Sequence, residues 1–163
     1  MNKKIHYDVI LKNGKAVLPE GITEVDIAIK DENISIIGNL SDCTAENIID
    51  CSGLHILPGV IDSQVHFREP GLENKENLES GMLAAAAGGV VAVFEMPNTS
   101  PLTITPETIE DKLSRASRVA WTDYAFYLGG TGRTGPNLGK WENAPGICGI
   151  KIFMGASTGD LLA

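Results

Sequence analysis

The sequence predicts an α/β fold in which a small β unit precedes alternating strands and helices. Three observations carry this prediction. Residues 5–57 hold short apolar runs separated by turn residues. From residue 58 onward, strand-like apolar runs alternate with segments of helical periodicity, which is typical of parallel α/β domains. The 18 glycines fall mostly between these runs, as expected where strands and helices are joined by tight connections.

The β unit is expected to be mostly antiparallel. Residues 7–14 form an apolar run that ends in Asn13-Gly14, a dipeptide typical of hairpin turns, so residues 15–18 would be the return strand. Polar and apolar side chains then alternate as in a half-buried strand. Residues 24–30 show this alternation, and a further strand is expected at 33–38 after a turn.

The α/β part should contain four strands and two clear helices. The strands are expected to end near Phe67 and to cover 90–96, 122–128 and 149–155. The helices are expected at 74–87, stopped by Gly88-Gly89, and at 105–118, with Thr105 as N-cap. Residues 131–146 are rich in Gly, Pro and Asn and indicate a loop or an irregular crossover. A complete (β/α)8 TIM-type barrel takes about 250 residues, so residues 58–163 could hold its first half.

Composition excludes several classes of function. Lys and Arg number 13 and Asp and Glu 21, a net charge of −8, and no basic stripe points to nucleic acid. No apolar run is long enough for a membrane span, and the N-terminus lacks the apolar core of a secretory signal. The cysteines (Cys43, Cys51 and Cys148) form no CxxC pair, which indicates free thiols and a cytoplasmic location.

One cluster of polar residues ends the first strand of the α/β part. Asp62, Gln64, His66 and Arg68 alternate along the chain, so they would share one face of the strand. Polar side chains on a buried strand are costly unless they bind something. An edge strand with a solvated face explains the same pattern equally well.

Four other residues have both a functional and an ordinary interpretation. Lys151 lies in an apolar strand, where a lysine is rarely buried unless it is paired, although its side chain could extend to the rim of the barrel. Asn98 could bind a ligand through its amide or simply form a turn. Ser157 and Thr158 lie in a glycine-flanked loop, which indicates an anion-binding turn or, as we favour, a flexible one.

Taken together and in order, these clusters resemble the dihydroorotase branch of the amidohydrolase superfamily. The similar stretches are 57–62, 66–71, 95–99 and 149–155. The resemblance covers nearly the whole chain. It implies that residues 1–57 are the N-terminal segment of a β-sandwich domain. It also implies that residues 58–163 are the first four strands of a metal-dependent hydrolase barrel, truncated after the fourth.

The resemblance also implies roles for five residues. Arg68 would bind the substrate carboxylate, with Asn98 assisting, since guanidinium forks match carboxylates. His66 and a carboxylated Lys151 would hold one or two zinc ions, with Gln64 as a third ligand. The family usually has His-x-His where this chain has Gln64-Val65-His66, and imidazole is the better zinc ligand. The family's two further histidines and its catalytic aspartate fall on later strands, so we expect no catalytic residue within this chain.

The resulting expectation is a dihydroorotase-like cyclic amidohydrolase. It would interconvert N-carbamoyl-L-aspartate and dihydroorotate in pyrimidine biosynthesis, and the isolated fragment would be inactive. One alternative is a catalytically silent scaffold, favoured by Gln64. Another is a hydantoinase or allantoinase, against which Arg68 argues. The expected partners are the small-molecule substrate and either further copies of the chain or aspartate transcarbamoylase.

Overall fold

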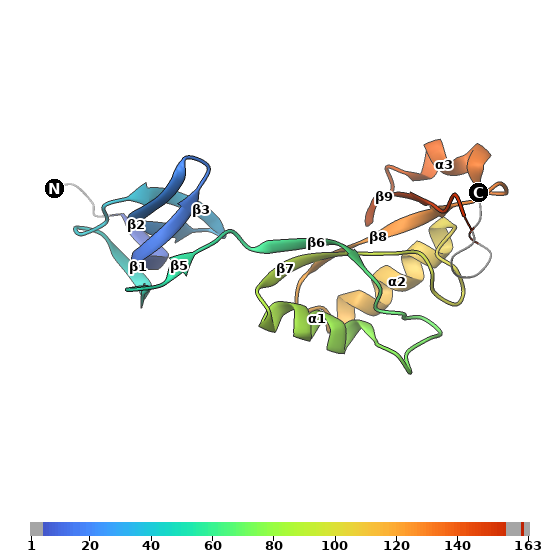
Figure 1. Cartoon of the computed structure of the whole chain (residues 1–163), viewed down its shortest axis with the longest axis horizontal. Coiled ribbons are helices and arrows are strands. Elements are labelled where there is room, and N and C mark those ends of the chain that lie inside the picture. The colour runs from blue at the N-terminus through green and yellow to red at the C-terminus, as the bar shows by residue number, and fades with distance from the viewer. Residues whose placement is uncertain (1–4, 156–160, 162–163) are drawn as a thin grey trace. The chain divides into compact units, whose positions relative to one another are not determined.

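The computed structural model describes residues 5–155 and Leu161, in two compact units that comprise residues 1–58 and 59–163 (Figure 1). The first unit is built from strands and the second from strands and helices, so the predicted α/β class is confirmed.

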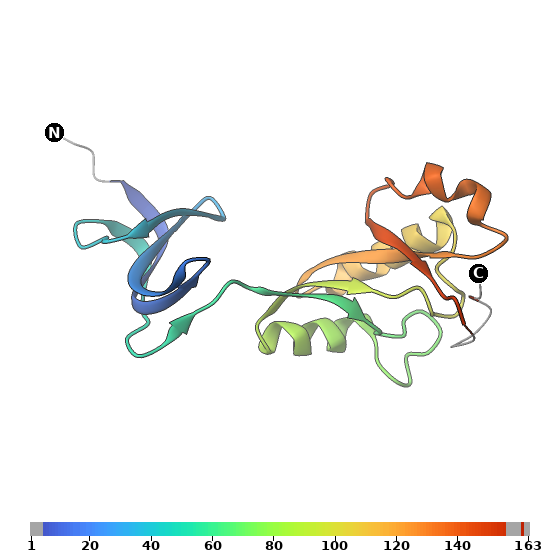
Figure 2. The same ribbon diagram turned by 45° about the horizontal axis from the view of Figure 1, so that its top comes forward.

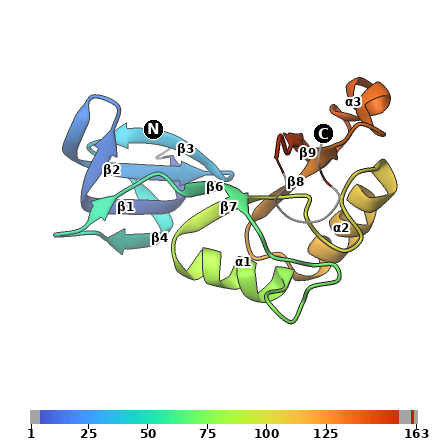
Figure 3. The same cartoon turned by 45° about the vertical axis from the view of Figure 1, so that its right-hand side comes forward.

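The first unit is a five-stranded sheet, whose strand β4 is labelled in Figure 3. Its strands are β1 (His6–Leu18), β2 (Gly21–Lys30), β3 (Asn33–Gly38), β4 (Thr44–Asp50) and β5 (His55–Ile56). The order is β3-β2-β1-β4, and β5 also pairs with β1. The pairs β1–β2 and β2–β3 are antiparallel, whereas β4 and β5 run parallel to β1. Tyr7, Ile10, Ala28 and Leu40 form its buried core.

The predicted hairpin turn at Asn13-Gly14 is wrong, because β1 continues through it to Leu18. Asn13 does adopt the left-handed conformation (φ 62°) that favours asparagine, but it marks an irregularity in the pairing of β1 with β2. Its backbone N–H donates to Asp26 Oδ1 at 3.0 Å, and its side-chain amide donates to Asp50 Oδ1 at 3.0 Å. These two contacts with neighbouring strands hold Asn13 inside the sheet.

The second unit is a four-stranded parallel sheet with helices packed against one face (Figures 1 and 2). Its elements are β6 (Val60–Val65), α1 (Leu78–Ala87), β7 (Val90–Glu95), α2 (Pro106–Val119), β8 (Asp123–Gly130), α3 (Gly135–Trp141) and β9 (Ile147–Ile152). The strand order β6-β7-β8-β9 follows the chain, and every neighbouring pair is parallel. This is the arrangement expected at the start of a β/α barrel.

Apolar side chains join the helices to the sheet. The buried core contains Leu78 and Met82 of α1 and Ile109 and Ala116 of α2, together with Val93, Phe126 and Leu128 of the strands. Leu138 and Trp141 of α3 pack against the same core. We call the face of the sheet opposite this core the open face.

The two predicted helices are confirmed, and a third was missed. Asn77 accepts a hydrogen bond from Ser80 N–H at the start of α1, and Thr105 accepts one from Thr108 N–H at the start of α2. The missed helix is α3, which falls within the stretch expected to be a loop because Gly and Pro are poor helix formers. In the part of the chain that the structure describes, no helix is long and apolar enough to cross a bilayer.

Candidate functional site

Gln64 and His66 lie on the open face of the sheet. Val65 and Phe67 pack against the core on the helix side. Because neighbouring residues of an extended chain point to opposite faces, Gln64 and His66 point the other way. Gln64 is exposed and His66 is half-buried. Among the described strands, β6 lies at one edge of the sheet.

Lys151 lies on the same face, at the other edge of the described sheet. Leu128 belongs to the core and pairs with Ile150, so the next pair, Gly129 and Lys151, faces the open side. Lys151 is half-buried, and its Nζ lies 5.2 Å from the centre of the Phe153 ring. Both Lys151 and His66 are near the carboxyl ends of their strands, which is where active sites of β/α barrels are built.

His66 and Asn98 are in direct contact. Nδ1 of His66 lies 2.7 Å from Oδ1 of Asn98. Asn98 lies in the loop that follows β7 and is buried, with only 8% of its surface exposed. Neither of the two interpretations of Asn98, ligand contact or simple turn residue, anticipated that its side chain would contact the imidazole.

Arg68 occupies a special backbone position beside this pair. Its φ is 69°, in the left-handed region that few non-glycine residues adopt. The side chain is half-buried, and no other described side chain forms an ion pair or hydrogen bond with the guanidinium. Asp62, by contrast, turns back on its own strand, since its Oδ1 accepts a 3.0 Å hydrogen bond from Gln64 N–H.

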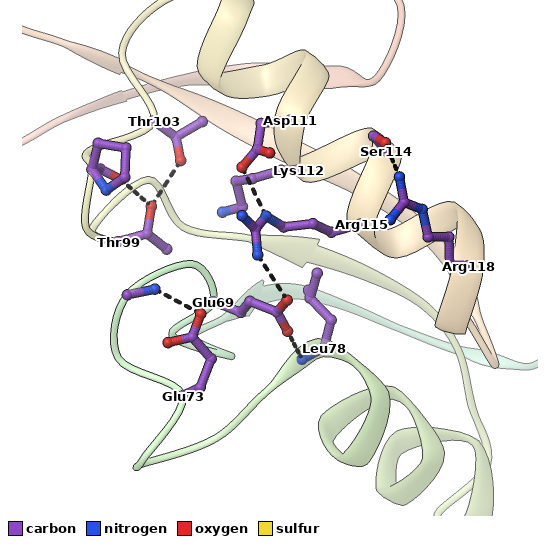
Figure 4. Close-up of polar contacts among 12 residues, drawn as sticks. Glu69, Glu73, Leu78, Thr99, Thr103, Asp111, Lys112, Ser114, Arg115 and Arg118 are labelled. Carbon is purple, nitrogen blue, oxygen red and sulfur yellow. Dashed lines mark hydrogen bonds and ion pairs between the residues drawn. The ribbon is translucent and has the colours of Figure 1, made fainter.

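Backbone hydrogen bonds join the loop that follows β7 to the loop that follows β6 and to the end of strand β8. Ser100 N–H donates to the Pro70 carbonyl at 2.9 Å, and Gly129 N–H donates to the Thr103 carbonyl at 2.8 Å. Thr99 and Thr103 hydroxyls, 3.0 Å apart, connect the two ends of the middle loop (Figure 4). Gly71 has φ +91°, and a Cβ there would lie 2.0 Å from the Ser100 carbonyl oxygen.

On the helix side of the same strand ends, Glu95 and Lys112 form a buried ion pair. Lys112 Nζ lies 2.7 Å from Glu95 Oε2, and each side chain is 1% exposed. The ammonium also lies 4.7 Å from the centre of the Phe126 ring. No hydrogen bond of standard geometry from the described residues reaches the carboxylate oxygens or Nζ, so the charges depend on each other.

Burial opposes both charges of this pair. It raises the pKa of the Glu95 carboxyl, while the Lys112 ammonium and the nearby backbone N–H groups of Phe67 and Arg68 offset part of the rise. Burial likewise lowers the pKa of Lys112, against the effect of Glu95. Sequence reasoning missed this pair. The available signal was the position of Lys112 at helical spacing between Ile109 and Ala116, on the buried face of α2.

A second, more exposed ionic network secures the loop that follows β6. Glu69 Oε2 accepts a 3.0 Å hydrogen bond from the Leu78 N–H at the start of α1, where the helix dipole favours an anion. Its other oxygen lies 3.4 Å from Arg115, whose guanidinium also binds Asp111 at 2.8 Å (Figure 4). Glu73 Oε1 accepts a 2.8 Å hydrogen bond from Gly71 N–H. The polypeptide carrying His66 and Arg68 is therefore anchored to helices α1 and α2.

The predicted site residues fit part of a metal site. Among the described residues, no three His, Cys, Asp or Glu side chains gather as metal ligands. The contact with Asn98 leaves His66 Nε2 as the nitrogen for a metal, and Gln64 and Lys151 share its face of the sheet. The predicted Ser157 and Thr158 turn lies outside the described residues.

Comparison with known proteins gives this arrangement a family context. Residues 53–131 match a family model described as dihydro-orotase-like. An allantoinase of Desulfitobacterium hafniense is 41% identical over 151 residues, which are 91% of this chain and 33% of the relative. A dihydroorotase of Streptococcus pyogenes is 39% identical over 112 residues, which are 68% of this chain and 26% of the relative.

A solved structure agrees with these matches. The L-hydantoinase (dihydropyrimidinase) of Arthrobacter aurescens superposes with a TM-score of 0.89 and 36% identity over 96% of this chain and 35% of that protein. The chain thus spans about one third of the length of the relatives it matches. The relatives include allantoinases, hydantoinases and dihydroorotases, so dihydroorotase is not singled out. The chain is thus similar to about one third of the length of these allantoinases, hydantoinases and dihydroorotases, and part of it matches the dihydro-orotase-like family model.

Proposed function

We propose that the gene product containing this chain is a zinc-dependent hydrolase that opens the ring of a cyclic amide. The contact between His66 and Asn98 is the observation that carries the proposal. It presents one imidazole nitrogen on the open face of the sheet, at the strand ends where Lys151 also lies. The named relatives support the reaction class.

In this proposal His66 holds zinc together with Lys151, carboxylated to a carbamate, and with Gln64 as a weaker ligand. Bound zinc supplies an activated water and polarises the amide carbonyl. The side chains of this chain provide the rest of the local chemistry. Asn98 orients the imidazole, and Arg68 offers a charged donor fork beside it. The three free cysteines support a reducing, cytoplasmic location.

We propose a cyclic ureide of the allantoin or hydantoin type as the first candidate substrate. The allantoinase match and the L-hydantoinase structure each extend over more than nine tenths of this chain, whereas the dihydroorotase match covers about two thirds. The resemblance described above, and residues 67–71 in particular, favours dihydroorotate instead. That reaction remains the second candidate, because the half-buried Arg68 guanidinium has no partner among the described side chains and suits a substrate carboxylate.

The test is to measure turnover of allantoin, hydantoin and dihydroorotate by the zinc-loaded gene product and by its Arg68→Gln variant. If dihydroorotate is the substrate, Arg68→Gln should raise its KM by roughly 100-fold, because a charge-assisted bidentate contact is lost. If a ureide without a carboxylate is the substrate, the same variant should change KM far less.

Absence of turnover on all three substrates would contradict the proposal. A Gln64→His variant would then test whether the protein is a catalytically silent relative. Activity that appears only after this substitution would identify a catalytically silent relative, as the scaffold alternative holds. For a silent relative of this kind, the proposed partners are further copies of the same protein or aspartate transcarbamoylase.

A further inference from the structure

The side chain of Asn98 acts on His66 through one specific atom pair. The amide oxygen Oδ1, and not the amide nitrogen, faces Nδ1 of the ring at 2.7 Å. An amide oxygen accepts hydrogen bonds and cannot donate them. The imidazole must therefore carry its proton on Nδ1, and in the neutral ring Nε2 keeps its lone pair.

We propose that Asn98 is a positioning residue that selects the metal-binding tautomer of His66, in place of the substrate-binding role that the family resemblance implied. The inference rests on the proposed function for its biological purpose, but the tautomer itself is a property of the metal-free protein. Histidine ligands of metals commonly donate their second ring N–H to an oxygen acceptor, which fixes both the tautomer and the ring orientation.

The surroundings of Asn98 suit an orienting role. Asn98 is 8% exposed, and the neighbouring Thr99 is held by its hydroxyl, which donates to the Pro101 carbonyl and accepts from the Thr103 hydroxyl. Met96, which follows β7, donates its N–H to the carbonyl of Val65 at the end of β6 (3.0 Å), one residue before His66 and two residues before Asn98. The distance between the amide and the imidazole is thus set by backbone as well as by side chains.

The experiment measures the tautomer of His66 directly. Uniformly 15N-labelled, metal-free gene product is studied by two-bond 15N–1H spectroscopy at a pH well above the ordinary imidazole pKa. A His66→Gln variant assigns the signals, since His6 and His55 are also present. We expect the wild-type ring to be protonated at Nδ1. In Asn98→Leu, which keeps a similar volume but removes the acceptor, the proton should redistribute toward Nε2.

Zinc titration supplies the second readout. Asn98→Leu should lower zinc affinity by about 10- to 100-fold, the usual effect of losing such an orienting group. Asn98→Asp keeps an acceptor oxygen, so it should retain the Nδ1–H tautomer and most of the affinity. Thr99→Val is the matched control, because it disturbs the same loop without touching His66, and it should leave both readouts unchanged. If Asn98→Leu is too poorly folded for spectroscopy, Asn98→Ala replaces it.

Two results would overturn the inference: an Nε2–H tautomer in the wild-type protein, or an Asn98→Leu variant with unchanged tautomer and zinc affinity. Equal effects of Thr99→Val and Asn98→Leu would also overturn it, since they would show a general loop disturbance. Failure of the proposed function is distinguishable. In that case the wild-type protein binds no zinc, yet the tautomer of His66 still responds to Asn98→Leu.

Discussion

Lys112 Nζ lies 2.7 Å from Glu95 Oε2, in a contact from which solvent is almost completely excluded. Removing one partner leaves the other charge buried in the core without a counter-charge. Lys112→Met or Glu95→Gln alone should therefore lower the free energy of unfolding of the second unit by about 3–5 kcal/mol, as measured by urea denaturation.

Replacing both partners gives the decisive comparison. Glu95→Leu combined with Lys112→Met leaves no buried charge and should restore stability to near the wild-type value, since apolar replacements of buried pairs are often neutral or stabilising. Lys30→Met removes an exposed ion pair with Asp8 and is the matched control, which should shift the urea midpoint little. Additive losses in the double variant would contradict this account of the pair.

Gly71 is expected to be irreplaceable because of both its backbone conformation and its neighbour. Gly71→Ala would have to adopt a φ of +91° and push away the Ser100 carbonyl. Gly53→Ala is the control, since Gly53 has φ +77° with no atom near a new Cβ, and it isolates the conformational cost of about 1–2 kcal/mol. Urea denaturation should show a clearly larger loss of unfolding free energy for Gly71→Ala than for Gly53→Ala. Equal losses would mean that the contact with Ser100 is unimportant.

The ion pair of the first unit should make stability depend on acidity. A hydrogen bond with Lys30, reinforced by the Asp31 N–H, lowers the pKa of Asp8 below its ordinary value of 3.8. Because the folded pKa is the lower one, the stabilisation is present above 3.8 and is lost as the pH falls through the folded pKa. Melting temperatures over this range should decrease less steeply for Asp8→Asn than for the wild type.

A suitable control for that measurement is Asp42→Asn, since Asp42 is exposed and forms no ion pair in the described part of the chain. Its acid profile should follow that of the wild type. Parallel profiles for Asp8→Asn and the wild type would show that Asp8 contributes nothing to the acid sensitivity.

The thiol of Cys148 should be unreactive in the folded protein. Burial raises its pKa to about 11 from an ordinary 9.0, so the thiolate population near neutral pH falls by about 100-fold. With Cys43 and Cys51 changed to serine, iodoacetamide should label Cys148 far more slowly in the folded protein than in urea. Similar rates in both states would contradict this prediction.

Sequence reasoning succeeded where local patterns decide the outcome. The helix beginning at Thr105 was predicted because its capping residue and the proline that follows act within one turn of the chain. The same local reasoning was wrong at Asn13-Gly14, because contacts with Asp26 and Asp50 on other strands decide the conformation there. A turn signal states which backbone angles are favourable, and the tertiary structure decides whether the chain reverses.

In the site, too, local patterns were predictable from the sequence and contacts between distant residues were not. Alternation along the strand placed Gln64 and His66 on one face, since that depends only on the period of an extended chain. The contact between His66 and Asn98 joins residues 32 positions apart, and the pair Glu95–Lys112 joins a strand to a helix. Such pairs depend on how neighbouring β/α units pack, which no single segment encodes.

The backbone hydrogen bonds made by the loop after β7 also constrain protein engineering. Ser100 in this loop donates to Pro70 in the loop after β6, and Thr103 accepts from Gly129 near the end of β8. Grafting one loop from a relative would leave the neighbouring loop with an unsatisfied carbonyl or N–H group. Exchanging these segments with those of a relative would therefore require replacing the loops after β6 and β7 together.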